Sequence, residues 1–191
     1  MPAPSPDSPA NGLVFAGRLP LTWQEMATLP DEMELRELDR TNLQVLNTLF
    51  ALEIHAGDFG DDPSVLAGAS ELKRLDFKVS LLLELVGQLF ARQQNIPPER
   101  LLILAVDSLI WPADAALALN SLLRLELYCN LSYPRPLLLP AQVAEITPAA
   151  NGWRIQARFH APSLSLQEAL ERYIFLQHRR AIANSRRHSP R

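Results

Sequence analysis

Leucine and valine recur at alternating spacings of three and four residues in one stretch of the chain, without a miss. The positions are Leu72, Leu75, Val79, Leu82, Val86 and Leu89. This is the a/d pattern of a heptad repeat, which keeps one stripe of a helix turned toward partner helices. It predicts a helix that associates with other helices, from the same chain or from further copies of it. The alternative is a helix buried inside a single globular domain.

The apolar surface of this helix is wider than a two-stranded coiled coil needs. On the same register, Phe77, Leu81, Leu83, Leu85 and Phe90 fall outside the a and d positions. A broad apolar face suits a helix that packs against more than one neighbour. We therefore expect a homo-oligomer, with a tetramer favoured over a dimer.

A second long helix precedes the heptad segment. From Asp31 onward the chain takes a helical period, and acidic residues crowd the first turn, where they meet the positive end of the helix dipole. Asp62-Pro63 predicts the start of the heptad helix, and Pro97-Pro98 predicts its end. Residues 31–95 thus predict two antiparallel helices. Asn42 falls at a core-type position, where a polar group can set the register at some cost in stability.

The rest of the chain before its last helix has the period of strands. The expected strands are residues 13–23, 101–106, 123–128, 137–146 and 153–159. In two of them, 123–128 and 153–159, apolar side chains alternate with polar ones, as in strands with one buried face. Asn151-Gly152 predicts a tight turn between the last two strands. Several short strands about ten residues apart indicate a small antiparallel barrel or sandwich.

A last helix follows Pro162-Ser163 and runs into a basic end. Its apolar positions are Leu164, Leu166, Leu170, Ile174, Phe175 and Ile182. Its arginines are Arg172, Arg179, Arg180, Arg186, Arg187 and, at the chain end, Arg191. Such a cluster is typical of a solvated helix end that complements the helix dipole. The alternative is a docking patch for an acidic protein surface.

These elements define an α+β fold: a β-barrel unit interrupted by a helical hairpin and closed by a C-terminal helix. We expect a disordered lead-in over residues 1–12, which are rich in proline, serine and alanine. One folded unit should span residues 13–184, with the oligomerisation hairpin inserted at 31–95. Residues 185–191 are expected to be a basic, disordered tail.

Composition narrows the function. The 191 residues include 48% hydrophobic side chains and carry a formal charge of −3, which favours a globular core and does not indicate nucleic-acid binding. The one cysteine, Cys129, excludes an internal disulfide and fits a reducing compartment. The longest apolar run, near 79–91, contains Glu84 and Gln88, so no membrane span is expected. The N-terminus lacks a signal peptide pattern, and we expect a soluble, cytoplasmic protein.

No catalytic or metal-binding motif is present in the sequence. The four histidines, His55, His160, His178 and His188, form no H-x-x-x-H or H-E-x-x-H pair. Cys129 ends an alternating strand and suits a small buried hydrophobe. The chain has no glycine-rich phosphate loop. We expect no enzyme activity, no cofactor and no metal.

Several segments together resemble the PilZ-domain family, in particular its subgroup with a long helical insertion. They are LKRLDFKVSLLLELVGQLFARQQNIPPERLLILAVDSLIW, SLLRLELYCN, VAEI, GWRIQARF and, most specifically, LQEALERYIFLQHRRAIA. The resemblance covers roughly residues 13–184. It implies a six-stranded barrel with a C-terminal helix, in a family best known as receptors for cyclic di-GMP. Members of the inserted subgroup are expected to assemble through their helices.

The two ligand motifs of that family are missing. Its Arg-x-x-x-Arg motif would supply planar cations for phosphates and guanine, but Arg18 has no arginine four residues away on either side. At the Asp, Ser and Gly positions of the second motif stand Ile103, Ala105 and Ser108. We therefore expect no tight cyclic di-GMP binding at the usual place. The alternative is a relocated site that uses Arg18 with Arg154 or Arg158.

The preferred interpretation is a non-enzymatic, oligomeric adaptor in cyclic di-GMP-linked signalling or motility, such as type IV pilus function. It would present several barrels to a protein partner in signalling or pilus biogenesis. The alternative is a cyclic di-GMP receptor that binds through a non-standard site.

Overall fold

The computed structural model describes residues 13–57 and 95–187, and four residue pairs between them: 74–75, 78–79, 81–82 and 85–86. For 53–57 and 181–187 it describes the backbone alone. The elements follow in the order β1 (Phe15–Met26), α1 (Glu32–Gly57), β2 (Glu99–Leu104), β3 (Ser108–Ala113), β4 (Leu122–Leu127), β5 (Leu137–Ala149), β6 (Gly152–Phe159) and α3 (Leu164–Arg187). The helix α3 ends three residues past the boundary that we expected for the folded unit.

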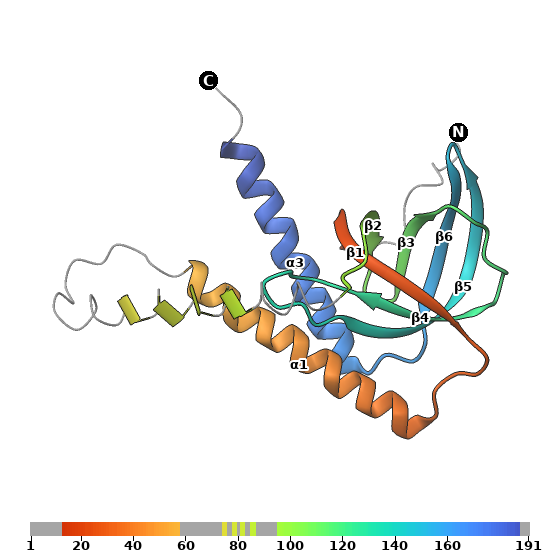
Figure 1. Ribbon diagram of the computed structural model, residues 1–191, viewed down its shortest axis with the longest axis horizontal. Coiled ribbons are helices and arrows are strands. Elements are labelled where there is room, and N and C mark those ends of the chain that lie inside the picture. Colours follow the sequence, from red (N-terminus) through yellow and green to blue (C-terminus); the bar gives the residue numbers. More distant parts are fainter. Residues whose placement is uncertain are drawn as a thin grey trace, which may run out of the picture.

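The strands close into an antiparallel barrel in the order β1-β2-β3-β6-β5-β4 (Figure 1). The long strand β1 makes the closure, because its first half pairs with β2 and its second half pairs with β4. Closure pairs every strand with two neighbours, which leaves little free strand edge along which other chains could add. The predicted fold class, a barrel interrupted by a helical segment and followed by a C-terminal helix, is confirmed.

One strand, β3, was not expected from the sequence. It contains Pro112, which has no backbone N–H and argues against a paired strand. The structure accommodates the proline near the end of β3. β3 pairs with β6 along its full length, from Ser108 to Ala113. Its register pairs with β2 are Ile103↔Ile110 and Leu104↔Leu109, which precede Pro112 on β3.

The tight turn between β5 and β6 is confirmed. β5 ends at Ala149 and β6 begins at Gly152, whose φ of 114° is a left-handed conformation. A Cβ at this position would lie 2.4 Å from the carbonyl oxygen of Ala113 in β3. Glycine is therefore required both by the backbone conformation and by the close approach of the neighbouring strand.

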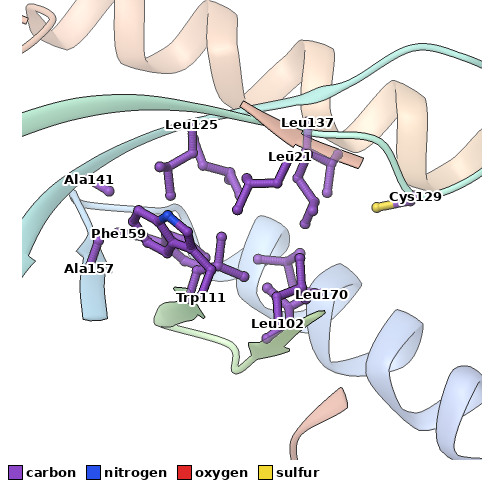
Figure 2. Close-up of a cluster of buried hydrophobic side chains, with 14 of the residues drawn as sticks. Leu21, Leu102, Trp111, Leu125, Cys129, Leu137, Ala141, Ala157, Phe159 and Leu170 are labelled. Atoms are coloured by element: carbon purple, nitrogen blue, oxygen red, sulfur yellow. The ribbon is translucent and has the colours of Figure 1, made fainter. Parts of the chain in front are cut away.

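The hydrophobic core fills the barrel and continues between the helices and the barrel (Figure 2). α1 contributes Val45, Leu46, Leu49 and Phe50, and α3 contributes Leu166, Leu170, Tyr173 and Ile174. The expected apolar face of the last helix was partly wrong, since Leu164 is 70% exposed and Phe175 is 49% exposed. Tyr173 takes the inward position instead, because its ring packs on Phe15 and its hydroxyl donates to the carbonyl of Cys129 at 3.4 Å.

Asn42 attaches α1 to the outside of the barrel. Its side chain is 1% exposed, and its amide both donates to the carbonyl of Leu138 and accepts from the N–H of Leu138, each at 2.8 Å. The pairing of β6 with β5 begins at Ala141, so this part of β5 has no strand neighbour on that side. The side-chain amide of Asn42 therefore makes the two backbone hydrogen bonds that a neighbouring strand would otherwise make with Leu138. Asn42 fixes helix to strand, rather than one helix to another.

Both helices begin with side-chain caps. The N–H of Asp31 donates to Glu34 at 3.0 Å and the N–H of Glu34 donates to Asp31 at 2.8 Å, a reciprocal capping box. At the start of α3 the Ser163 hydroxyl accepts from the N–H of Leu166 at 3.2 Å. The N–H of Ser163 donates to Asp39 of α1 at 2.8 Å, which ties the start of α3 to α1.

Candidate assembly and ligand surfaces

The described part of the heptad segment is helical, and its large apolar side chains are exposed. Along the seam, Leu75 is 60%, Val79 46%, Leu82 61% and Val86 45% exposed. Leu72 and Leu89, the two end positions of the predicted seam, lie outside the described residues, as do Asp62-Pro63. In Figure 1 the short helical pieces of this segment lie away from the barrel. The role of these side chains in oligomerisation stays a prediction.

Two further leucines widen the seam on one side. Leu81 is 45% exposed and Leu85 is 48% exposed. At 100° per residue, the six apolar side chains from Leu75 to Val86 cover a sector of about 160° around the helix. A sector this wide matches a helix in contact with two neighbours, and a two-stranded seam is narrower.

The structure brings two of the three predicted ligand arginines to one level of the outer barrel surface. Arg18 of β1 pairs with Leu101 of β2, and Arg154 of β6 pairs with Pro112 of β3. The level is shared because Leu101 and Pro112 lie two residues beyond the Ile103↔Ile110 pair, in the same direction. Three strand spacings therefore separate the arginines, roughly 14 Å between their Cα atoms.

Arg158 lies elsewhere on the same strand. It pairs with Ser108, four residues along β6 from Arg154. Four residues along a strand correspond to about 13 Å between the Cα atoms of Arg154 and Arg158. One small ligand placed between Arg18 and Arg154 would therefore lie far from Arg158. Ligand or partner contacts by Arg18, Arg154 and Arg158 remain predictions.

The positions of the family's second ligand motif offer little polar chemistry. Ile103 is a half-buried apolar side chain on the outer barrel surface. Ala105 and Ser108 close the turn between β2 and β3, since the N–H of Ala105 donates to the carbonyl of Ser108 at 2.9 Å. Ser108 is 4% exposed, and its hydroxyl donates a hydrogen bond to the carboxylate of Asp107 at 3.0 Å. These groups are engaged within the turn.

Sequence reasoning missed an apolar strip on the outside of β2. Leu101 begins the continuous apolar run of the predicted strand 101–106, and its side chain is 60% exposed. Leu102 and Leu104 point into the core, with 1% and 0% exposed. In a small barrel one face of every strand points outward. A strand that lacks alternation is thus the signal of an apolar outer surface.

Cys129 is a buried hydrophobe, as the sequence indicated. It is 9% exposed, and burial raises the pKa of its thiol to about 12, an effect only partly opposed by the hydrogen bond from Tyr173. A thiol with this pKa carries almost no thiolate at neutral pH and is a poor nucleophile. No cluster of metal-ligating side chains occurs among the residues that the structure describes. Within the same residues, none of the helices is both long and apolar enough to cross a bilayer.

An open groove of about 870 Å³ runs along α1 to the start of α3. It is lined mainly by polar and charged side chains, including Arg36, Asp39, Arg40 and Ser163. Arg36 pairs with Glu32 at 2.6 Å, and Asp39 accepts from the backbone of Ser163. Arg36 and Asp39 are therefore already occupied by interactions at the start of α1 and at the start of α3, respectively.

The family model of the atypical PilZ domain, described as a cyclic di-GMP receptor, matches residues 46–187. The match covers well over half of the chain, and the chain belongs to this family. The matched range starts within α1 and leaves out β1, although β1 closes the barrel between β2 and β4. The folded unit of this protein therefore extends beyond the matched range.

Solved structures give the same result. A pathogenic protein from Xanthomonas campestris aligns with a TM-score of 0.71 and 25% identity, over 91% of this chain and 92% of its own. It is described as a new tetrameric PilZ domain that self-assembles through an unusual helical bundle. The Bacillus subtilis inhibitor of motility aligns over 43% of this chain and 42% of its own, with 16% identity and a TM-score of 0.36, too low to indicate a shared fold. No curated protein matches the sequence.

The predicted resemblance to the PilZ family, including its subgroup with inserted helices, is thereby confirmed. The comparisons also support a place in cyclic di-GMP-linked regulation, through the description of the family as receptors for this nucleotide.

Proposed function

We propose that this protein is a non-enzymatic adaptor in bacterial cyclic di-GMP-linked signalling, which assembles into a tetramer through its inserted helices. It would act in the cytoplasm and present four barrels to a protein partner in motility or type IV pilus function. The observation that carries the proposal is the exposed apolar sector of the heptad segment, in which Leu75 and Leu82 are 60% and 61% exposed.

Exposure of this sector in a single chain is unfavourable. Burial of a leucine or valine side chain contributes about 1.5–3 kcal/mol, so covering the exposed half of each contributes about 1 kcal/mol. Six such side chains in each protomer give a substantial driving force for association. The tetrameric Xanthomonas relative, built through a helical bundle, supports the same number of chains here.

Light scattering coupled to gel filtration tests the assembly. The full chain should have about four times the protomer mass of 21.4 kDa. Leu82→Glu and Val86→Asp should reduce it to the protomer mass, because an unpaired charge in the bundle is costly. The control is Leu119→Glu, at a residue that is 58% exposed in the loop before β4, and it should leave the mass unchanged. An unchanged mass in Leu82→Glu would refute assembly through the helices.

A cyclic di-GMP receptor with a non-standard site is the second candidate. The family description favours it, and so does the placement of Arg18 and Arg154 on one outer face of the barrel. The side chains at the second motif argue against it. Ile103 and Ala105 are apolar, and the hydroxyl of Ser108 is hydrogen-bonded to Asp107, so these three positions offer a nucleotide little polar contact.

Titration calorimetry with cyclic di-GMP separates the two candidates. The adaptor proposal expects no binding in the micromolar range or tighter. Micromolar binding that is abolished by Arg154→Ala or Arg158→Ala would establish the receptor instead. Binding that survives both substitutions would place the nucleotide elsewhere and would also contradict the adaptor as proposed.

A further inference from the structure

Only one side of the second half of β5 has a strand neighbour. β4 pairs with β5 as far as Gln142, whereas β6 continues beside β5 as far as Ala149. The last bonded residue on the β4 side is Val143. Its N–H donates to the carbonyl of Ser121, and its carbonyl accepts from the N–H of Asn120, each at 2.9 Å. Beyond Val143, none of the residues that the structure describes makes a backbone hydrogen bond to this side of β5.

The chain before β4 turns away from β5 at Asn120. This residue has a φ of 65°, a left-handed conformation. Next to it, the N–H of Ser121 donates to the carbonyl of Ala118 at 3.1 Å, which closes a turn. Asparagine tolerates the left-handed conformation better than most residues, and the conformation is incompatible with a continued strand. The segment before β4 therefore leaves β5 instead of continuing beside it.

The backbone groups on the unpaired side of β5 follow from Pro148. Its register partner on β6 is Trp153, and proline has no N–H with which to bond that partner. In an antiparallel pair, residues bonded to the partner strand alternate with residues whose backbone groups point away from it. Pro148 is of the second kind, and so is Ile146, two residues earlier. The N–H and carbonyl of Ile146 and the carbonyl of Pro148 therefore point away from β6. We refer to residues 144–148 as the open edge of β5.

Three features keep the open edge short and unsuited to its own copy. A β-bulge between Val143 and Glu145 lies at one end, and Pro148 lacks a donor at the other. Such features protect edge strands from unlimited pairing with further sheets. If the edges of two copies paired at Ile146, their Glu145 side chains would lie diagonally opposite each other, and like charges across a sheet are unfavourable. The edge therefore favours a short segment of another protein.

We propose that the open edge of β5 docks a short extended segment of a partner protein, which adds as a strand beside Ile146. In an antiparallel pairing, one residue of the segment exchanges two hydrogen bonds with Ile146. The residue two positions before it donates its N–H to the carbonyl of Pro148. Ile146 is half-buried, which favours an apolar, β-branched residue opposite it. The next residue of the segment lies opposite the exposed Glu145, where lysine or arginine is favoured.

Backbone groups dominate recognition at this edge, and charge has a smaller part. Besides Glu145, the nearby charged side chains are Arg154 and Asp114. Arg154 pairs with Thr147 across β6 and already makes an interaction of its own. Asp114 lies beside the turn at Gly152, on the far side of β6 from the open edge. We therefore expect the affinity to depend only weakly on salt.

The open edge lies away from the helices that are proposed to assemble the protein. In Figure 1 the β5–β6 hairpin and the heptad segment are at opposite ends of the molecule. A tetramer formed through the inserted helices thus leaves four open edges accessible, and a partner with several segments would gain avidity from them. The inference rests on the proposed adaptor function in requiring a protein partner, but it does not require the tetramer.

Amide hydrogen exchange of the full chain tests the edge without a ligand. The N–H of Ile146 should exchange at least about tenfold faster than the N–H of Thr147, because the backbone groups of Thr147 face β6. Equal protection of the two would show that another part of the chain already covers the edge, and it would overturn the proposal.

Peptide display supplies a ligand. Random twelve-residue peptides are selected on the wild-type chain and counter-selected on Ile146→Pro, which removes the donor but leaves the bonds between β5 and β6 in place. In fluorescence polarisation the best peptide should bind Ile146→Pro at least about tenfold more weakly than wild type. The matched control is Ala150→Pro, in the exposed turn after β5, where proline is tolerated. It should leave binding unchanged, and thermal unfolding checks that both variants fold.

An N-methyl scan of the selected peptide distinguishes strand addition from side-chain docking and needs no protein variant. Only alternate N–H groups of an added strand face β5. Methylation of these should weaken binding at least about tenfold, and methylation of the residues between them should have little effect. In the complex the N–H of Ile146 should become protected from exchange. A scan without alternation, no enriched peptide, or equal binding to wild type and Ile146→Pro would overturn the proposal.

The outcomes are separable from those of the assembly test. Peptide binding by Leu82→Glu at monomer mass would uphold the docking edge while the tetramer fails. A tetramer that selects no peptide would uphold assembly and overturn the docking edge. A mass above four protomers that Ile146→Pro lowers would identify a second copy of this chain as the occupant, and it would overturn the partner segment.

Discussion

The side chain of Asn42 holds α1 on the barrel through both backbone groups of Leu138, and its replacement by leucine should cost much of the protein's stability. Both hydrogen bonds measure 2.8 Å, and Asn42 is 1% exposed. Leucine is similar enough in size to remain in place and to exclude water. The substitution therefore leaves one N–H and one carbonyl of β5 without partners.

The magnitude follows from those two groups. An unsatisfied buried donor or acceptor costs about 1–3 kcal/mol, and the apolar burial of leucine offsets part of the sum. We expect the free energy of unfolding to fall by about 2–4 kcal/mol. Asn42→Ala should cost less, because it leaves space in which a water molecule can bond both groups.

Urea unfolding measures this difference. The variants are compared at one protomer concentration in a Leu82→Glu background, so that association does not add to the apparent stability. Asn47→Leu is the matched control, since Asn47 is exposed on the same helix. It should be neutral or slightly stabilising, because leucine has the better helix propensity. A loss in Asn42→Leu of less than about 0.5 kcal/mol relative to this control would refute the assigned role.

Three further substitutions probe the fold. Gly152→Ala should destabilise the protein by about 2 kcal/mol or more in thermal unfolding, because its Cβ meets the Ala113 carbonyl at 2.4 Å and its φ is 114°; a neutral result would contradict this geometry. The pKa of Cys129, raised by burial from 9.0 to about 12, keeps the folded thiol protonated, so a thiol reagent at about pH 8 should label it only as fast as the chain opens. Because the unfolded thiol ionises first, stability should fall as pH rises from about 9 toward 12, and Cys129→Ala should remove this part of the loss in urea unfolding. Arg172→Gln should cost about 0.5–1 kcal/mol in the same assay, since the guanidinium lies 4.4 Å from the ring centroid of Phe50; no loss would show that the contact does not stabilise the fold.

The elements with a clear period were predictable from the sequence. In β4 and β6 the alternation of side chains follows from one buried and one solvent-facing side, and both strands lie where the alternation places them. The start of α3 after Pro162-Ser163 and the turn at Gly152 also follow from local backbone preferences. These features depend on neighbours within a few residues, which the sequence contains in full.

The candidate surfaces were predictable only in part. The sequence singled out Arg18 and Arg154, but their common level depends on the register of β1, β2, β3 and β6. The sequence did not indicate that Leu101 is exposed, because it lies in a continuous apolar run with no alternation of polar residues. β3 was not among the expected strands, and whether Pro112 is tolerated there depends on which neighbouring strands pair beside it.

By itself, the sequence determined the heptad stripe, the periods of most strands and the absence of the family's arginine motif, since each is a matter of residue type and spacing along the chain. The tertiary structure alone decided that Asn42 serves a strand, that Tyr173 rather than Phe175 enters the core, and that Arg18 and Arg154 lie at one level of the outer barrel surface. The physical reason is that burial and pairing are set by segments far apart in the chain, and barrel closure fixes which of them meet.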